Sequence, residues 1–379
     1  MAGKPFYAFW LFFPAASLWA ALAVPLSIFA VTSGTGWPPG LLGAGHGHEL
    51  IFGFALALVA GYTLGLQPWR VLAPLFLLWI TARLFWLMAP SLLISQALSV
   101  AFALLLARHV VPRFQAAKKW RNKIAGPLIL TICLAALAYA LSHYGFPLPD
   151  TRSIMQAAIL GLLLLMTFIG GRIIAPAVAG TLEKQGVPLE ARVQPRIEGT
   201  LLILLPVALL CMFTPLTARI SGLLLVVCAV LILIRALRWK LWHCPDRPDL
   251  LVLAIGYLWL AAGAGVTGLH LLTFSPPLPA LHIITIGALG TLSSSVMLRL
   301  AWQRAHRSFP PRWQVLTIAI AMTVAVISRY MAGATPYGQP EMLWISAASW
   351  SLSYTGVAVQ VLLLYRRSVT RLPARNPTL

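Results

Sequence analysis

The stretch LTARISGLLLVVCAVLILIRALRW, residues 216–239, decides the class of this chain. All residues between Arg219 and Arg235 are uncharged, and most of them are aliphatic. A helix that crosses a bilayer needs about 20 predominantly apolar residues, because each residue adds about 1.5 Å along the axis. This stretch therefore predicts a transmembrane helix.

The whole chain has the same character. Of its 379 residues 60% are hydrophobic and 9% are charged, and the mean hydropathy is +0.86. A soluble domain carries roughly a quarter charged residues. This composition excludes a soluble enzyme, a disordered tail protein and a disulfide scaffold. We expect an all-α integral membrane protein with a single polytopic domain over residues 1–379.

Apolar runs separated by proline, glycine and charge predict twelve transmembrane helices. Two halves of six helices, near residues 1–180 and 195–379, are one interpretation of this series. The expected spans are Phe6–Ala30, His48–Leu66, Val71–Met88, Leu92–Val111, Ile124–Tyr144, Ile154–Pro176, Gly199–Phe213, Leu216–Trp239, Leu250–Leu272, Leu278–Trp302, Trp313–Met331 and Met342–Tyr365.

The basic residues predict the orientation. With a cytoplasmic N-terminus, every Lys and Arg falls on the inner side except Arg83, Arg152, Arg219 and Arg329. Short inner loops of membrane proteins carry such an excess of positive charge. We therefore expect both termini to be cytoplasmic, in a bacterial inner (cytoplasmic) membrane. The net charge of +20 then reflects contact with the lipid bilayer and predicts no nucleic-acid partner.

Histidines gather at the outer ends of the expected helices. Neutral imidazole is the commonest protein ligand for metals, including haem iron. The alternative is that these histidines simply meet water or lipid headgroups. The residues are His46, His48, His143, His270 and His282, and the metal candidates among them are His46, His48, His270 and His282.

Small residues follow two of these histidines. A row at i+4 spacing predicts one helix face that a second helix or a flat macrocycle can approach closely. His48 and His282 are each followed five residues later by a glycine, Gly53 and Gly287. The row on the second expected helix is Glu49, Gly53, Ala57, Gly61 and Gly65.

Two arginines lie inside the expected outer membrane half, where charge is costly and calls for a partner. Arg83 and Arg329 each have two possible partners, the Glu49 carboxylate or the carboxylates of a haem. Glu49 is the catalytic candidate, either orienting a ligand histidine or relaying protons. No nucleophile motif, phosphate-binding loop or HExxH zinc motif occurs, which argues against hydrolysis and ATP-driven work.

At these residues the sequence resembles a known family. HGHELIFGF at residues 46–54 resembles the HxHEMxFGF signature of the NnrS family. The resemblance continues through residues 79–84, 121–122, 170–172, 238–239, 256–259, 282–291 and 297–299. It implies a twelve-helix membrane protein that contains haem and copper and is linked to denitrification and nitric oxide stress.

Two departures from the family pattern concern the inner side. Ala254 stands where the family usually has a histidine, and QRAHR at residues 303–307 replaces a Gly–His–Thr–Gly–Arg segment. They place a second, inner metal site in doubt and leave the outer one intact.

The leading hypothesis is a membrane protein with haem b and copper that binds or converts nitric oxide, as a nitric oxide-converting oxidoreductase if it is an enzyme. His48 and His282 are the expected iron ligands, and His46 and His270 the copper ligands. Arg83 and Arg329 would hold the haem propionates, and Gly53 and Gly287 would lie beside the cofactor. No flavin, iron–sulfur or c-type haem motif is encoded, so electrons would come from a membrane donor.

Two alternatives stay open at this stage. One is a secondary transporter or metal-handling permease without a chromophore, since twelve helices with intramembrane arginine and glycine or proline interruptions fit that class. The other is a b-type haem electron carrier that has a quinone site and lacks copper. The sequence does not decide whether nitric oxide is reduced, oxidised, sensed or only bound.

Overall fold

The structure, a computed structural model, describes the backbone of residues 5–370 and the side chains of residues 5–368 except those at 121 and 215. The first half of the chain contains β1 (Phe6–Tyr7), α1 (Phe9–Thr32), η1 (Pro39–Leu41), α2 (Gly45–His48), η2 (Glu49–Ala55), α3 (Leu56–Thr63), β2 (Leu66–Gln67), α4 (Trp69–Met88), α5 (Leu93–Gln115), α6 (Trp120–Lys123), α7 (Ala125–His143) and α8 (Thr151–Glu183). The second half contains η3 (Glu190–Arg192), α9 (Pro195–Cys211), α10 (Pro215–Leu237), η4 (Leu241–His243), α11 (Pro248–Leu272), α12 (Leu278–His282), η5 (Ile283–Gly290), α13 (Thr291–His306), α14 (Arg312–Met331), η6 (Pro336–Gly338) and α15 (Pro340–Thr370).

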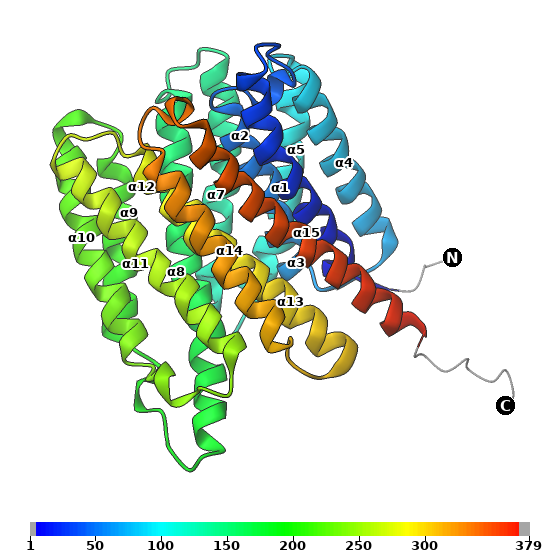
Figure 1. Cartoon of the computed structure of the whole chain (residues 1–379), viewed down its shortest axis with the longest axis vertical. Coiled ribbons are helices and arrows are strands. Elements are labelled where there is room, and N and C mark those ends of the chain that lie inside the picture. Colours follow the sequence, from blue (N-terminus) through cyan, green and yellow to red (C-terminus); the bar gives the residue numbers. More distant parts are fainter. Residues whose placement is uncertain (1–4, 371–379) are drawn as a thin grey trace, which may run out of the picture.

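The helices form one bundle of long, tilted rods (Figure 1). Within the described residues, 11 helices are long and apolar enough to cross a membrane. The second expected span is also helical, but it consists of three pieces, α2, η2 and α3, which follow one another without a break over residues 45–63. The expected all-α membrane fold is confirmed, and the protein is a multi-pass membrane protein.

Several helix ends differ from the expected ones, and two of them differ for the same reason. The first helix begins at Phe9 rather than Phe6, and the second ends at Thr63 rather than Leu66. Gly65 has a positive φ of 63°, a conformation that breaks a helix and suits glycine. The chain then pairs Leu66–Gln67 with Phe6–Tyr7 as a short antiparallel sheet.

The first and last helices pack side by side and bring both ends of the chain to one face (Figure 1). Trp350 Nε1 of α15 donates to the Ala20 carbonyl of α1 at 2.9 Å. At the far ends of the same helices, the rings of Phe6 and Tyr365 lie 5.8 Å apart. Because both ends lie at the same face, the chain crosses the membrane an even number of times. That this face is cytoplasmic stays a prediction.

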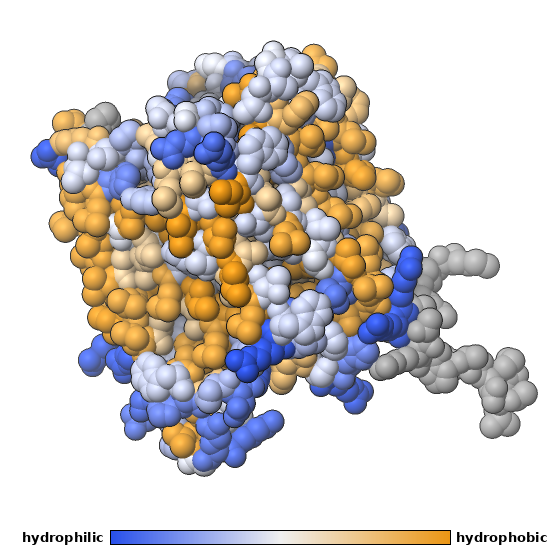
Figure 2. Space-filling view, viewed as in Figure 1, coloured by the Kyte–Doolittle hydropathy of each residue, from blue (hydrophilic) through white to orange (hydrophobic). Residues whose placement is uncertain are grey.

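The surface fits a membrane environment. Figure 2 shows apolar side chains over the middle of the molecule and polar ones at its ends, most densely at the lower end, where α8 ends and the connection from α10 to α11 runs. This is the end to which the charge pattern assigns the basic loops. Of the basic residues counted there, Lys4, Arg371 and Arg375 lie outside the described residues.

A short connection holds the start of the second span against α4. Trp86 Nε1 of α4 donates to the Gly40 carbonyl of η1 at 2.8 Å. A Cβ atom on Gly40 would overlap the backbone of Trp86, and one on Gly45 would overlap the Gly40 carbonyl. This close backbone contact fixes where the segment with His46 and His48 begins.

Gly40→Ala is expected to lower the free energy of unfolding by about 1–3 kcal/mol, the usual cost of overpacking a tight contact. Thermal denaturation of the detergent-solubilised protein measures the effect. Gly180→Ala is the matched control, because a Cβ atom there meets nothing within 4 Å. Equal midpoints for the two variants would contradict the close contact.

Candidate metal site at the histidine end

Two π-helical segments begin directly after two of the candidate histidines. The segment η2 covers Glu49–Ala55 and follows His48, and η5 covers Ile283–Gly290 and follows His282. A π-helix closes its hydrogen bonds from residue i to i+5, and such segments occur frequently at functional sites. The five-residue spacing from His48 to Gly53 and from His282 to Gly287 is the spacing of this turn.

The expected i+4 row on the second helix is therefore wrong in part. The π-helical turn interrupts the α-helical register between Glu49 and Ala55, and Gly65 lies beyond the end of α3. Gly53 faces Arg83 of α4, whereas Gly61 faces Phe12 and Phe13 of α1. The small residues thus make room for side chains of two different helices.

A buried ion pair occupies the first π-helical segment. Arg83 Nη1 donates to Glu49 Oε1 at 2.6 Å, and Arg83 Nη2 donates to the Ser99 hydroxyl at 2.9 Å. Glu49 is fully buried, and Arg83 is 1% exposed. Arg83 thus takes the first of its two expected partners, Glu49. Glu49 Oε2 and Arg83 Nε have no hydrogen bond within the described part of the chain.

His48 is fixed by the same carboxylate. Its Nδ1 lies 3.1 Å from Glu49 Oε1, and its ring stacks on that of Trp86, with 3.3 Å between centroids and 3° between planes. Phe52 and Tyr139 complete the ring contacts. Glu49 therefore has the position expected of a carboxylate that orients a ligand histidine.

His46 and His282 face each other across the bundle. Their ring centroids are 6.4 Å apart and their planes differ by 24°. A metal ion lies about 2.0–2.1 Å from a ligating imidazole nitrogen, and that nitrogen lies about 1.1 Å from the ring centre. Two imidazoles on opposite sides of one ion would thus have centroids about 6.3 Å apart. The separation of this pair fits a shared ion.

The four candidate histidines share one hydrogen-bonding pattern. Each Nδ1 has an oxygen within hydrogen-bond distance, which fixes the ring and leaves Nε2 as the nitrogen with a lone pair. Ligating histidines in metalloproteins have this arrangement. The oxygens are the Gly43 carbonyl for His46, Glu49 Oε1 for His48, the Pro276 carbonyl for His270 and the Leu278 carbonyl for His282, at 2.9, 3.1, 2.8 and 2.8 Å.

Arg329 lies within electrostatic range of this pair, whereas His270 contacts the residue that follows Arg329. Arg329 is within electrostatic range of both His46 and His282, and its Nη1 donates to the Gly333 carbonyl at 3.3 Å. His270 Nε2 lies 3.4 Å from the Tyr330 hydroxyl. Gly287, expected beside a cofactor, instead faces the indole of Trp259.

Among the described residues, no group of three or more His, Cys, Asp or Glu side chains lies close enough to hold a metal. A pair of imidazoles suits copper or the two axial positions of a haem iron. Among the candidates, the rings of His46 and His282 come close to each other, and the division of iron and copper among the four histidines stays a prediction.

Comparison with known families decides the relationship. The family model described as NnrS protein matches residues 6–368, nearly the whole chain. The chain belongs to the NnrS family. No curated protein matches it. Membership in the NnrS family fits a membrane protein of the nitric oxide response.

Sequence reasoning missed three partners of this NnrS site. Trp86 stacks on His48, Ser99 bonds Arg83, and Trp79 Nε1 donates to the Gly53 carbonyl at 2.9 Å. Trp79 and Trp86 bracket Arg83 at i−4 and i+3, so they share its face of α4. That spacing could have identified the two tryptophans as neighbours of Arg83 from the sequence. No sequence pattern pointed to Ser99 on α5.

Arg83→Met is expected to lower the free energy of unfolding by about 3–5 kcal/mol, because it leaves the buried Glu49 carboxylate without its counterion. The double variant Glu49→Gln/Arg83→Met should recover part of that loss, since no buried charge remains. Thermal denaturation in detergent compares both with the wild-type protein. A double variant less stable than Arg83→Met would contradict the pairing.

Proposed function

We propose that this chain is a haem- and copper-containing protein of the bacterial inner membrane that binds or converts nitric oxide, in denitrification or in defence against nitrosative stress. The observation that carries the proposal is the His46–His282 pair, with 6.4 Å between ring centroids and with both Nδ1 atoms beside backbone carbonyls. Membership in the NnrS family supports the nitric oxide part.

In this proposal His46 and His282 hold one metal centre between them. A metal there with a coordination position left free would supply the centre to which nitric oxide binds. Arg329 is within electrostatic range of both rings and would meet an anionic group of the cofactor, such as a propionate. His48, first expected to bind iron with His282, and His270, first expected to bind copper with His46, are then the candidates for a second metal.

In this proposal Glu49 does not bind the metal. It orients the candidate ligand His48. Its Oε1 accepts from Arg83 and holds His48, and the Trp19 indole is a further neighbour of the same carboxylate. A buried carboxylate between a ligand histidine and these donors is suited to receive or pass a proton. Arg83 keeps Glu49 in place and supplies its countercharge.

His282→Ala is expected to abolish the haem absorption bands of the purified protein, because in this proposal it removes one of the two ligand imidazoles. His46→Ala should change the same bands or the metal content. Oxidised and dithionite-reduced spectra, with iron and copper counted on the same samples, measure both effects. His243→Ala is the control, since His243 is exposed on η4.

An unchanged spectrum in His282→Ala would refute the assignment of that residue. A colourless, metal-free wild-type protein from haem-replete cells would overturn the metal proposal and favour the transporter. Iron without copper would favour the b-type electron carrier. With both metals present, a spectral change on adding nitric oxide tests the ligand.

A further inference from the structure

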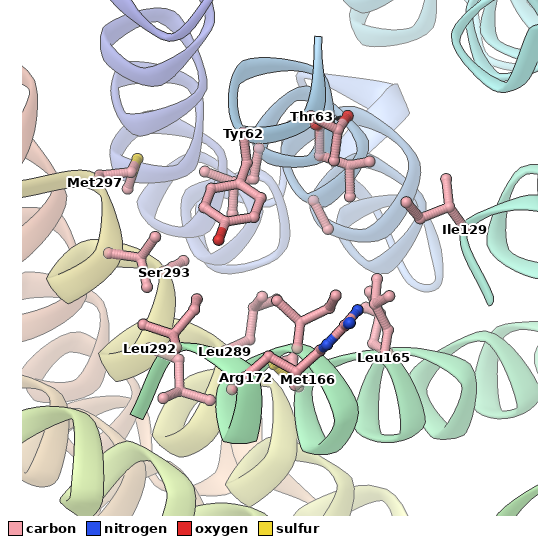
Figure 3. Close-up of a pocket in the computed structure, with 18 of the residues that line it drawn as sticks. Tyr62, Thr63, Ile129, Leu165, Met166, Arg172, Leu289, Leu292, Ser293 and Met297 are labelled. Carbon is pink, nitrogen blue, oxygen red and sulfur yellow. Dashed lines mark hydrogen bonds between the residues drawn. The ribbon is translucent and has the colours of Figure 1, made fainter. Parts of the chain in front are cut away.

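A cavity of about 340 Å³ lies in the bundle on the same two helical spans as the histidine site (Figure 3). Residues from Ala55 to Thr63 form one wall, residues from Leu289 to Met297 a second, and residues from Leu162 to Ile173 of α8 a third. An engineered cavity of about 150 Å³ holds benzene, and ligand pockets begin at about 300 Å³. This cavity has room for a substituted ring.

The wall of the cavity suits a flat conjugated ring. Phe13 and Phe114 line it, together with the thioethers of Met166 and Met297. Thioether sulfur makes favourable contacts with aromatic rings, and aromatic side chains stack on flat conjugated groups. The remaining lining is almost wholly aliphatic, so the occupant has to be largely apolar.

One hydroxyl points into this apolar space. The Tyr62 phenol reaches from α3 toward α8 and α13 (Figure 3), and the residue is 42% exposed. Its hydroxyl has no hydrogen bond to any other described residue. The neighbouring hydroxyls are already engaged, since Thr63 Oγ1 donates to the Val59 carbonyl and Ser293 Oγ bonds to the Tyr354 hydroxyl. Tyr62 is therefore a donor available to an occupant.

The charge around Tyr62 is positive. The guanidinium groups of Arg172 and Arg299 are within electrostatic range of its phenol, and no acidic side chain lines the cavity. This surrounding favours an occupant with a hydrogen-bond-accepting oxygen. Carbonyl oxygens of a quinone and the carboxylate of a fatty acid both have that chemistry.

The aromatic side chains of the wall and the carboxylate partner of Arg299 favour the neutral, flat group. Arg172 donates to Asn122 Oδ1, and Arg299 Nη1 donates to Asp249 Oδ2 at 2.7 Å. A carboxylate taken out of water needs its charge compensated, whereas a carbonyl needs one donor. We propose that this cavity binds the ring of a lipid-soluble quinone, with one carbonyl oxygen accepting from Tyr62.

This proposal does not rest on the metals at the histidine end. From His48 to Tyr62 the helix rises about 20 Å, so neither site needs the other's ligand to form. Quinone binding is thus expected in His282→Ala protein as well. That separates failure of this proposal from failure of the metal assignment.

The test is calorimetric titration of the purified full-length protein in detergent with decylubiquinone, and separately with palmitate. Decylubiquinone should bind saturably with one site per chain. Tyr62→Phe should weaken it roughly two- to tenfold, the worth of one hydrogen bond. Val296→Trp fills the cavity and should abolish binding, whereas Val227→Trp, on the outer surface of α10, should leave it unchanged.

Three results would overturn the proposal. The first is palmitate binding that depends on Tyr62 with no saturable quinone binding, which assigns the cavity to a carboxylate. The second is equal quinone uptake by both tryptophan variants, which means partition into detergent. The third is Tyr62→Phe protein that binds quinone as tightly as the wild type. Gel filtration checks that each variant is folded, and Tyr62→Phe removes a single exposed oxygen.

Discussion

The ion pair between Glu49 and Arg83 is the constraint around which the histidine end is built. Two opposite charges inside a membrane protein lose several kcal/mol of hydration each, and only a close contact with further hydrogen bonds offsets that loss. Arg83 Nη1 lies 2.6 Å from Glu49 Oε1, and three neighbouring residues make this close contact possible. Gly53 leaves space for the guanidinium, Ser99 receives its second nitrogen, and Trp79 covers the Gly53 carbonyl. His48 then bonds to a carboxylate that is already fixed.

The second half of the chain contains a second buried arginine–glutamate pair with the same kinds of neighbours. Arg235 of α10 is 3% exposed and donates to Glu198 Oε1 at 2.8 Å. Gly171 of α8 makes room for its guanidinium, as Gly53 does for Arg83. The Tyr257 hydroxyl and the Thr167 carbonyl occupy its other nitrogen, each at 3.0 Å. A buried arginine therefore requires a carboxylate, a glycine and a neutral oxygen together in both places.

Hydropathy was sufficient to predict the helices, because burial in lipid imposes length and composition on every span. It was also sufficient to single out Glu49 and Arg83, since so few charged residues lie within the spans, but it did not indicate Ser99. It did not predict the π-helical turns after His48 and His282, because a pattern read at 3.6 residues per turn assumes the register that those turns break. The five-residue spacing to Gly53 and Gly287 was visible in the sequence without indicating its cause. Which histidine faces which depends on packing between distant helices, and no single sequence contains that pairing.

The π-helical turns explain how one helical span can line both the histidine site and the apolar cavity. A π-helical turn inserts an extra residue, so the helix beyond it is rotated relative to the face that a regular helix would present. At the start of the turn, His48 and Glu49 face Trp86 and Arg83 of α4. From its end onward, Ala55, Leu58 and Tyr62 follow one another at α-helical spacing and face the cavity. A regular helix would keep one polar face along its whole length. The inserted turn instead lets a polar histidine end and an apolar cavity share the same two spans, each with its own partners.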